Sequence, residues 1–92
     1  MDGDPRVTQL ARILGCKRED LDGRAGAERI EAGSERLAAG LFEEAAASDD
    51  VVSAEAALEY LELRLAYLGD LVPAPVAEDV RRRFAELARQ WQ

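Results

Sequence analysis

Two pairs of glutamates are the residues of this chain whose type and spacing could do chemistry. Glu28 and Glu31 stand three positions apart, and so do Glu59 and Glu62. Residues three apart are neighbours on a helix surface, so each pair can present two carboxylates together. Paired carboxylates on two helices can hold Mg²⁺ through oxygen ligands, and the metal can then bind a triphosphate. The two pairs therefore support the one enzymatic hypothesis that this sequence offers.

The two E-x-x-E segments loosely resemble the all-α NTP pyrophosphohydrolases of the MazG type, which carry E-x-x-E followed by E-x-x-D. The resemblance covers these four positions alone and implies a Mg²⁺-dependent reaction on nucleotides. The sequence departs from the family pattern at Glu62, where the family has Asp. The same spacing is also typical of solvated faces on acidic helices. Glu28 and Glu31 point away from the apolar positions of their own helix, so convergence with the second pair requires that helix to turn its polar face inward.

Other catalytic groups are scarce. The chain has no histidine, which removes the commonest general base and metal ligand. The single cysteine, Cys16, has no histidine partner to activate it, so we interpret it as a small apolar residue. Three of the seven glycines lie inside an expected helix, and none lies between a strand and a helix, because no strand is expected. No phosphate-binding loop of the P-loop or dinucleotide type is therefore predicted.

A run of three arginines, Arg81 to Arg83, suggests a basic patch. Successive helical residues point about 100° apart, so the three side chains spread around the helix. Acidic residues stand four positions away at three places, which would pair Glu78 with Arg82, Asp79 with Arg83 and Arg82 with Glu86. We predict a surface of ion pairs and not a phosphate-binding site.

Residues 10–17, LARILGCK, are similar to the middle of a helix-turn-helix, in which a helix ending in Leu-Gly precedes a recognition helix. Two features disfavour DNA binding. Too few residues precede this segment to form the usual first helix. The segment that would read DNA, residues 18–22, carries three acidic residues that would face phosphates.

Composition limits the classes of partner. The formal net charge is −7 and the sequence pI is about 4.5, which disfavours nucleic acid and anionic membrane surfaces. No apolar run is long enough to span a bilayer, and the acidic start is unlike a secretory signal. One cysteine cannot form a disulfide within one chain. We expect a cytoplasmic protein, and the excess of arginine over lysine favours a GC-rich bacterial genome.

The spacing of apolar residues predicts a single all-α domain over residues 1–92, with helices at about 5–14, 24–47, 51–68 and 75–91. This is a small four-helix bundle with one short N-terminal helix and three longer ones. Pro73 and Pro75 form a stiff elbow that favours an antiparallel pair of helices. No segment shows the alternation of a strand.

Three glycines recur at intervals of seven inside the expected helix 24–47: Gly26, Gly33 and Gly40. Each costs a helix about 1 kcal/mol relative to Ala, so the register requires an explanation. We interpret it as a bare edge beside the bulky Ile30 and Leu37, which lets the third helix approach closely in a small-against-large seam. Codon bias or a recent duplication could also produce the repeat.

The third helix, residues 51–68, carries two apolar stripes on nearly opposite sides. The first consists of Ala54, Leu58, Leu61, Leu65, Leu68 and Val72. The second consists of Ala56, Tyr60, Leu63 and Tyr67. A helix that is apolar on two sides must be covered on two sides. We predict that a second copy covers the second stripe in a homodimer or higher even assembly, with Tyr60, Leu63, Tyr67 and Phe42 as interface candidates. Burial of both stripes within one chain is the alternative.

The sequence thus favours a small acidic cytoplasmic adaptor that acts through helix–helix surfaces, with no catalysis and no cofactor. Its partner would be an unidentified protein. The alternative is a Mg²⁺-dependent pyrophosphohydrolase-like enzyme that uses the four glutamates, and a less favoured one is a helix-turn-helix-like regulator.

Overall fold

Seven helical segments follow one another in the computed structural model, which describes residues 4–91. The α-helices are α1 (Pro5–Leu14), α2 (Gly23–Ala32), α3 (Ser34–Ala47), α4 (Ala54–Leu68) and α5 (Ala74–Ala88). Two short 3-10 helices, η1 (Arg18–Leu21) and η2 (Gly69–Leu71), join α1 to α2 and α4 to α5. No strand occurs in the described residues, so the predicted all-α class is confirmed.

The ends of α1 and α4 follow from local sequence. The Asp4 carboxylate accepts a hydrogen bond from the Arg6 backbone N–H at 3.0 Å and caps α1 at its start. Gly15 ends the helix with a φ of 74°, a left-handed conformation that glycine adopts without a steric penalty. The Ser53 hydroxyl accepts from the Ala56 N–H at 3.1 Å and starts α4. This cap explains why α4 begins at Ala54, three residues after the predicted start.

The helix expected over residues 24–47 is two helices, and this corrects the four-helix prediction. Gly33 separates α2 from α3 with φ −102° and ψ 14°, outside the helical range. Ser34 then begins α3 as a buried residue, and its hydroxyl donates to the Asp79 carboxylate on α5. A helix can break at a glycine at low cost, because glycine has the lowest helix propensity after proline.

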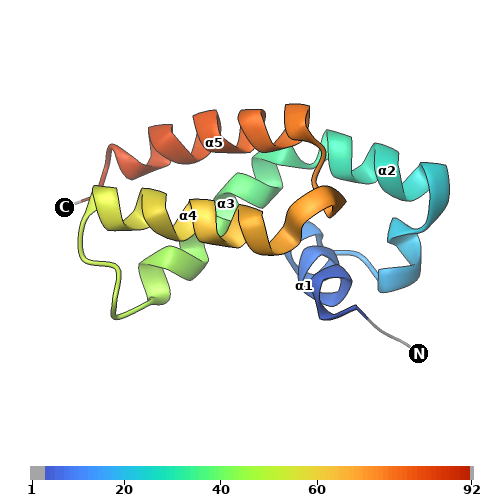
Figure 1. Ribbon diagram of the computed structural model, residues 1–92, viewed down its shortest axis with the longest axis horizontal. Coiled ribbons are helices and arrows are strands. Elements are labelled where there is room, and N and C mark those ends of the chain that lie inside the picture. The colour runs from blue at the N-terminus through green and yellow to red at the C-terminus, as the bar shows by residue number, and fades with distance from the viewer. Residues whose placement is uncertain (1–3, 92) are drawn as a thin grey trace.

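Helix α3 forms the centre of the fold. It makes its most extensive contact with α5 and also packs against α4 and α1. Helices α4 and α5 run side by side in opposite directions, and α3 crosses behind them (Figure 1). The radius of gyration is 13.0 Å, close to the roughly 12 Å of a compact domain of this length.

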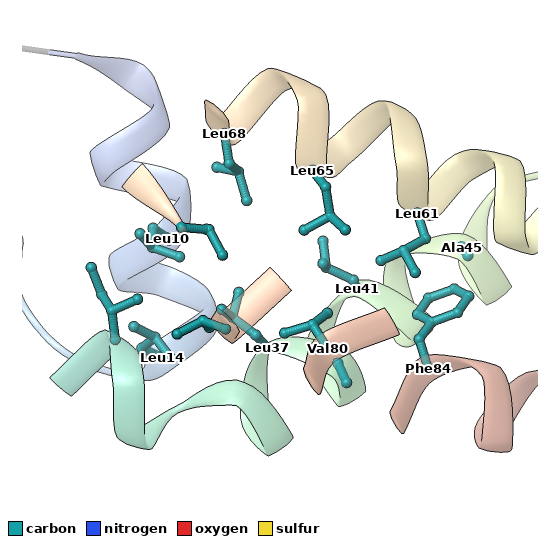
Figure 2. Packing of buried hydrophobic residues seen from close by; sticks show 14 of the residues in the cluster. Leu10, Leu14, Leu37, Leu41, Ala45, Leu61, Leu65, Leu68, Val80 and Phe84 are labelled. Carbon is teal, nitrogen blue, oxygen red and sulfur yellow. The ribbon is translucent and has the colours of Figure 1, made fainter. Parts of the chain in front are cut away.

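One apolar core fills the space between α1, α3, α4 and α5 (Figure 2). Leu37 and Leu41 from α3 meet Leu61 from α4 and Phe84 from α5, and all four are at most 1% exposed. The labelled residues of Figure 2 are Leu10, Leu14, Leu37, Leu41, Ala45, Leu61, Leu65, Leu68, Val80 and Phe84. A core of this kind supplies the main favourable term in folding.

The three glycines of the repeat lie against the N-terminal part of the chain, and we call this set the glycine edge. A Cβ placed on Gly26 would lie 2.0 Å from the carbonyl carbon and oxygen of Leu21 in η1. A Cβ on Gly40 would lie 2.6 Å from Ile13 Cγ2 in α1. Each glycine therefore allows a contact that a larger residue would prevent.

The neighbour at this edge differs from the predicted one. We expected the third helix there, and the structure has α1 and η1 instead. A Cβ on Gly33 would likewise meet α1, at 2.6 Å from Leu14 Cδ2. Ile30 and Leu37 are both buried in the core. The short N-terminal helix thus occupies the bare edge, where Ile13 and Leu14 pack against Gly40 and Gly33.

Candidate interaction surface

The outward side of α4 carries apolar side chains that remain partly or mostly exposed. Leu63 is 71% exposed, Tyr67 41% and Leu58 38%. We call these three residues, with Glu59 and Glu62 between Leu58 and Leu63, the α4 outer face. Leu58 and Tyr67 lie at its two opposite margins, nine positions and about 180° apart. Single exposed apolar residues are common on soluble proteins, but a group on one helix indicates a contact surface.

The period of the helix explains this exposure. The buried residues of α4 are Ala57, Leu61, Leu65 and Leu68. Leu63 lies two positions from both Leu61 and Leu65, which is about 200° around an α-helix. Its side chain must therefore point away from the core that holds the other two.

Leu58 corrects a detail of the predicted stripe. The spacing placed it among the buried residues, whereas in the structure it lies at the exposed margin of α4. Ala57 is fully buried in its place. A repeat of 3.5 residues drifts by about 20° per heptad from the true helical period, which moves the first leucine of the stripe away from the core. The spacing pattern did not predict that Ala57 is buried, because alanine is only weakly apolar.

Glu62 is part of a two-point ion pair that links α4 to α5. Arg81 Nε donates to Glu62 Oε2 at 2.8 Å, and Arg81 Nη2 donates to Glu62 Oε1 at 3.0 Å. The hydrogen bonds from this guanidinium hold the pKa of the Glu62 carboxyl below its ordinary value. Glu59 has no ion pair within residues 4–91. Its negative charge therefore stays unbalanced at the α4 outer face.

A shallow open hollow of about 500 Å³ lies over this part of α4. Leu58 and Leu63 form its apolar walls, and Glu59 and Glu62 stand between them. An open hollow of this kind is unlike the enclosed sites that bury most of a small ligand. The arrangement suits the side chains of another protein surface.

Tyr60, a predicted interface residue, lies half-buried where α4 meets α3. Its hydroxyl donates to Glu44 Oε1 at 3.0 Å. Burial raises the pKa of the Tyr60 phenol above its ordinary value, and the bond to Glu44 raises it further. Tyr60 therefore contributes to the contact between two helices of the same chain.

Tyr67 is also half-covered by its own helix. The Arg64 guanidinium lies over the Tyr67 ring, 5.2 Å from its centroid. Arg64 Nε is 3.5 Å from Glu44 Oε1, and Arg64 Nη2 donates to the Gln9 side chain. This network fixes the tyrosine ring next to Leu63 and leaves part of it exposed.

Phe42 differs from expectation. We predicted it as an interface residue, and the structure places it half-buried between two other rings. Its ring centroid lies 5.6 Å from that of Phe84 and 5.4 Å from that of Trp91, both in edge-to-face geometry. Such pairs stabilise beyond their buried area. Phe42 therefore anchors the C-terminal segment and does not line the α4 outer face.

The two acid pairs border different hollows. Glu28 lies beside a hollow at the α2–α3 junction, and Glu31 borders another next to Pro73. Glu59 and Glu62 border the hollow on α4. Within residues 4–91, no group of three or more acidic or cysteine side chains is placed to hold a metal ion. The structure thus does not bring together the four glutamates that the pyrophosphohydrolase hypothesis needs.

The arginine run forms ion pairs, as predicted, although not every partner is the predicted one. Arg83 Nε donates to Asp79 Oδ2 at 2.9 Å, which confirms the expected pair. Arg82 also bonds to Asp79, and not to the predicted Glu78 or Glu86. Arg81 reaches across to α4, so the run ties two helices together.

The segment compared with a helix-turn-helix forms no recognition helix. Residues 18–21 are the four-residue η1, and Gly23 starts α2 after it. Cys16 is half-buried against the core, as expected of a small apolar residue.

Comparisons with protein families, with curated proteins and with solved structures found no match for this chain. Within the described residues, no helix has both the length and the apolar character that a membrane crossing requires. The geometry of the surface is therefore the basis for any functional argument.

Proposed function

We propose that the protein is a non-catalytic interaction module that binds another protein surface through the α4 outer face. One observation carries the proposal: Leu63 is 71% exposed beside the half-exposed Tyr67, on a helix whose opposite side is core. Covering such side chains removes apolar surface from water, at about 25 cal/mol per Å². A partner helix can do this over several turns.

The chemistry of the chain favours binding over catalysis. The sequence has no histidine, and its one cysteine is half-buried against the core. The α4 outer face offers leucines, a tyrosine ring and carboxylates, which are contact groups. The wider adaptor role and the cytoplasmic location are parts of the proposal, and the predicted homodimer through this face is its alternative form.

Site-specific photocrosslinking tests the proposal directly. A benzoylphenylalanine residue is placed at position 63 in cells of the source organism. The matched control carries it at position 28, an exposed helical site on α2. We expect discrete crosslinked products from position 63 and none from position 28, and mass spectrometry will show whether the partner is a second copy. Equal products from both positions, or none from position 63, would contradict the proposal.

A further inference from the structure

The charges around the α4 outer face point to the chemistry of its partner, given the proposed function. Glu55, Glu59 and Glu62 stand four and three positions apart and are all exposed. They form one line beside Leu63, since such spacings place residues on the same side of a helix. Of the three, Glu62 is already paired with Arg81. Within residues 4–91, Glu55 and Glu59 have no ion pair.

From this arrangement we infer that the α4 outer face binds a basic amphipathic helix of another protein. Apolar side chains of that helix contact Leu58 and Leu63. Its lysines or arginines lie beside Glu55 and Glu59, whose charges are otherwise unbalanced. Helix α4 has 15 residues and is about 22 Å long, so a partner segment of about 15 residues covers it.

A second copy of this chain fits the same surface less well. Each copy carries a net charge of −7, and pairing two α4 helices brings their glutamate lines close together. Like charges placed opposite one another at an interface are unfavourable. The one basic residue of α4, Arg64, is already held by Glu44 and Gln9. In a pair of α4 helices, the α4 of the second copy therefore brings no available cation to Glu55 or Glu59.

The overall field of the molecule supports the same partner chemistry. A strongly negative protein attracts a basic segment over distances of about 10 Å at moderate salt. The field also repels polyanions, which disfavours a nucleic acid or an anionic lipid surface at the same site. Electrostatic complementarity of this kind mainly sets specificity and the association rate, while the leucines supply contact area.

A displayed library of amphipathic helices of about 15 residues provides the test. The apolar positions that would contact Leu58 and Leu63 are fixed. The positions between and beside them, which we call the flanking positions, vary among Lys, Arg, Glu, Gln and Ala. Selection uses the full-length protein, with Leu63→Ser as the counter-selection. We expect enrichment of Lys and Arg at flanking positions, and binding that weakens as salt is raised.

Two charge variants of the protein then distinguish a local effect of Glu55 and Glu59 from an effect of the net charge of the whole protein. The test variant is the double substitution Glu55→Gln and Glu59→Gln. The matched control is Glu28→Gln and Glu31→Gln, which changes the net charge equally on a different helix. We expect the selected helices to bind the test variant about fivefold to tenfold more weakly and the control almost unchanged.

Each other outcome has a definite meaning. Selected helices that need Leu63 but carry neutral or acidic flanks would overturn this inference and leave the interaction module intact. Equal weakening by both charge variants would also overturn it. Failure to select any helix whose binding needs Leu63 would also overturn this inference, while the crosslinking at position 63 tests the proposed function separately. A dimer in light scattering that Leu63→Ser converts to a monomer would assign the surface to a second copy.

Discussion

The glycine edge and the α4 outer face are two helix surfaces outside the central core, and they differ in what covers them. At the glycine edge, Gly26, Gly33 and Gly40 contact α1 and η1 of the same chain. At the α4 outer face, Leu63 is 71% exposed, and Tyr67 is 41% exposed beside the Arg64 guanidinium that covers part of its ring. The first surface is small and already filled. The second is bulky, acidic and open, as a surface for an outside partner must be.

The difference shows how side-chain size decides which contacts a chain makes with itself. A missing Cβ at Gly26 lets the Leu21 backbone approach directly, and this contact offsets the cost of about 1 kcal/mol for an interior glycine. On α4, a leucine at the surface costs the folded state little, since its apolar area is exposed in the unfolded chain too. Its burial by a partner is then available as binding energy.

The largest expected effect comes from Gly26→Ala. The new Cβ would meet the Leu21 backbone, which cannot move as a side-chain tip can. We expect a loss of about 3 kcal/mol in the free energy of unfolding, measured by urea titration. Ala27→Gly on the exposed side of the same helix is the control and should cost about 1 kcal/mol. A gain in stability from Gly26→Ala would show that the glycine edge is not packed.

Gly40→Ala should have a smaller effect, because its new Cβ meets the Ile13 side chain and not a backbone. We expect a net loss of about 1 kcal/mol, after the better helix propensity of alanine is counted. In an Ile13→Ala background the space is free, so the same substitution should become stabilising. A double-mutant cycle from urea unfolding measures this reversal. Equal effects of Gly40→Ala in both backgrounds would show that Gly40 does not pack against Ile13 of α1.

The ion pair between Glu62 and Arg81 predicts a modest pH effect. Since pairing lowers the pKa of Glu62 in the folded state, its stabilisation is complete above the ordinary value of 4.5. It is lost as the pH falls through the lowered pKa. Glu62→Gln should therefore cost less than about 1 kcal/mol at neutral pH, with a difference from wild type that disappears in acid. Thermal unfolding over a pH series checks this, and a difference that grows in acid would contradict it.

The smallest effect on folding should come from the α4 outer face itself. Leu63→Ser should change the free energy of unfolding by no more than about 0.5 kcal/mol, since the side chain is mostly in water. Leu61→Ala, two residues away in the core, should cost about 3 kcal/mol in the same assay. Similar losses for the two variants would mean that Leu63 is buried in solution, and the contrast between the two surfaces would fail.

Local signals in the sequence predicted a large part of the fold. The cap at Asp4 and the stop at Gly15 gave the bounds of α1, and the two prolines gave the antiparallel turn between α4 and α5. The break at Gly33 was missed because apolar spacing continues through it. The contact of Ser34 with Asp79, 45 positions away, lies at this break and could not be predicted from spacing within one helix.

The candidate surface was predicted in part. Helical spacing alone put Leu63 and Tyr67 opposite the core side of α4. It could not show that Phe42 packs against Phe84 and Trp91, because these rings lie more than 40 positions further along the chain. The acid pairs failed to meet for the same reason: spacing orders residues on one helix but does not place one helix relative to another.

The break at Gly33 also makes α2 a separate unit of ten residues, with only Gly26 and Ile30 buried. An isolated helix of that length is marginal in water, so α2 depends on its few contacts with η1 and α3. Its amide protons should exchange with solvent through local opening, at a free energy well below that of α3. One end of this small domain can thus loosen while the surface on α4 keeps its shape.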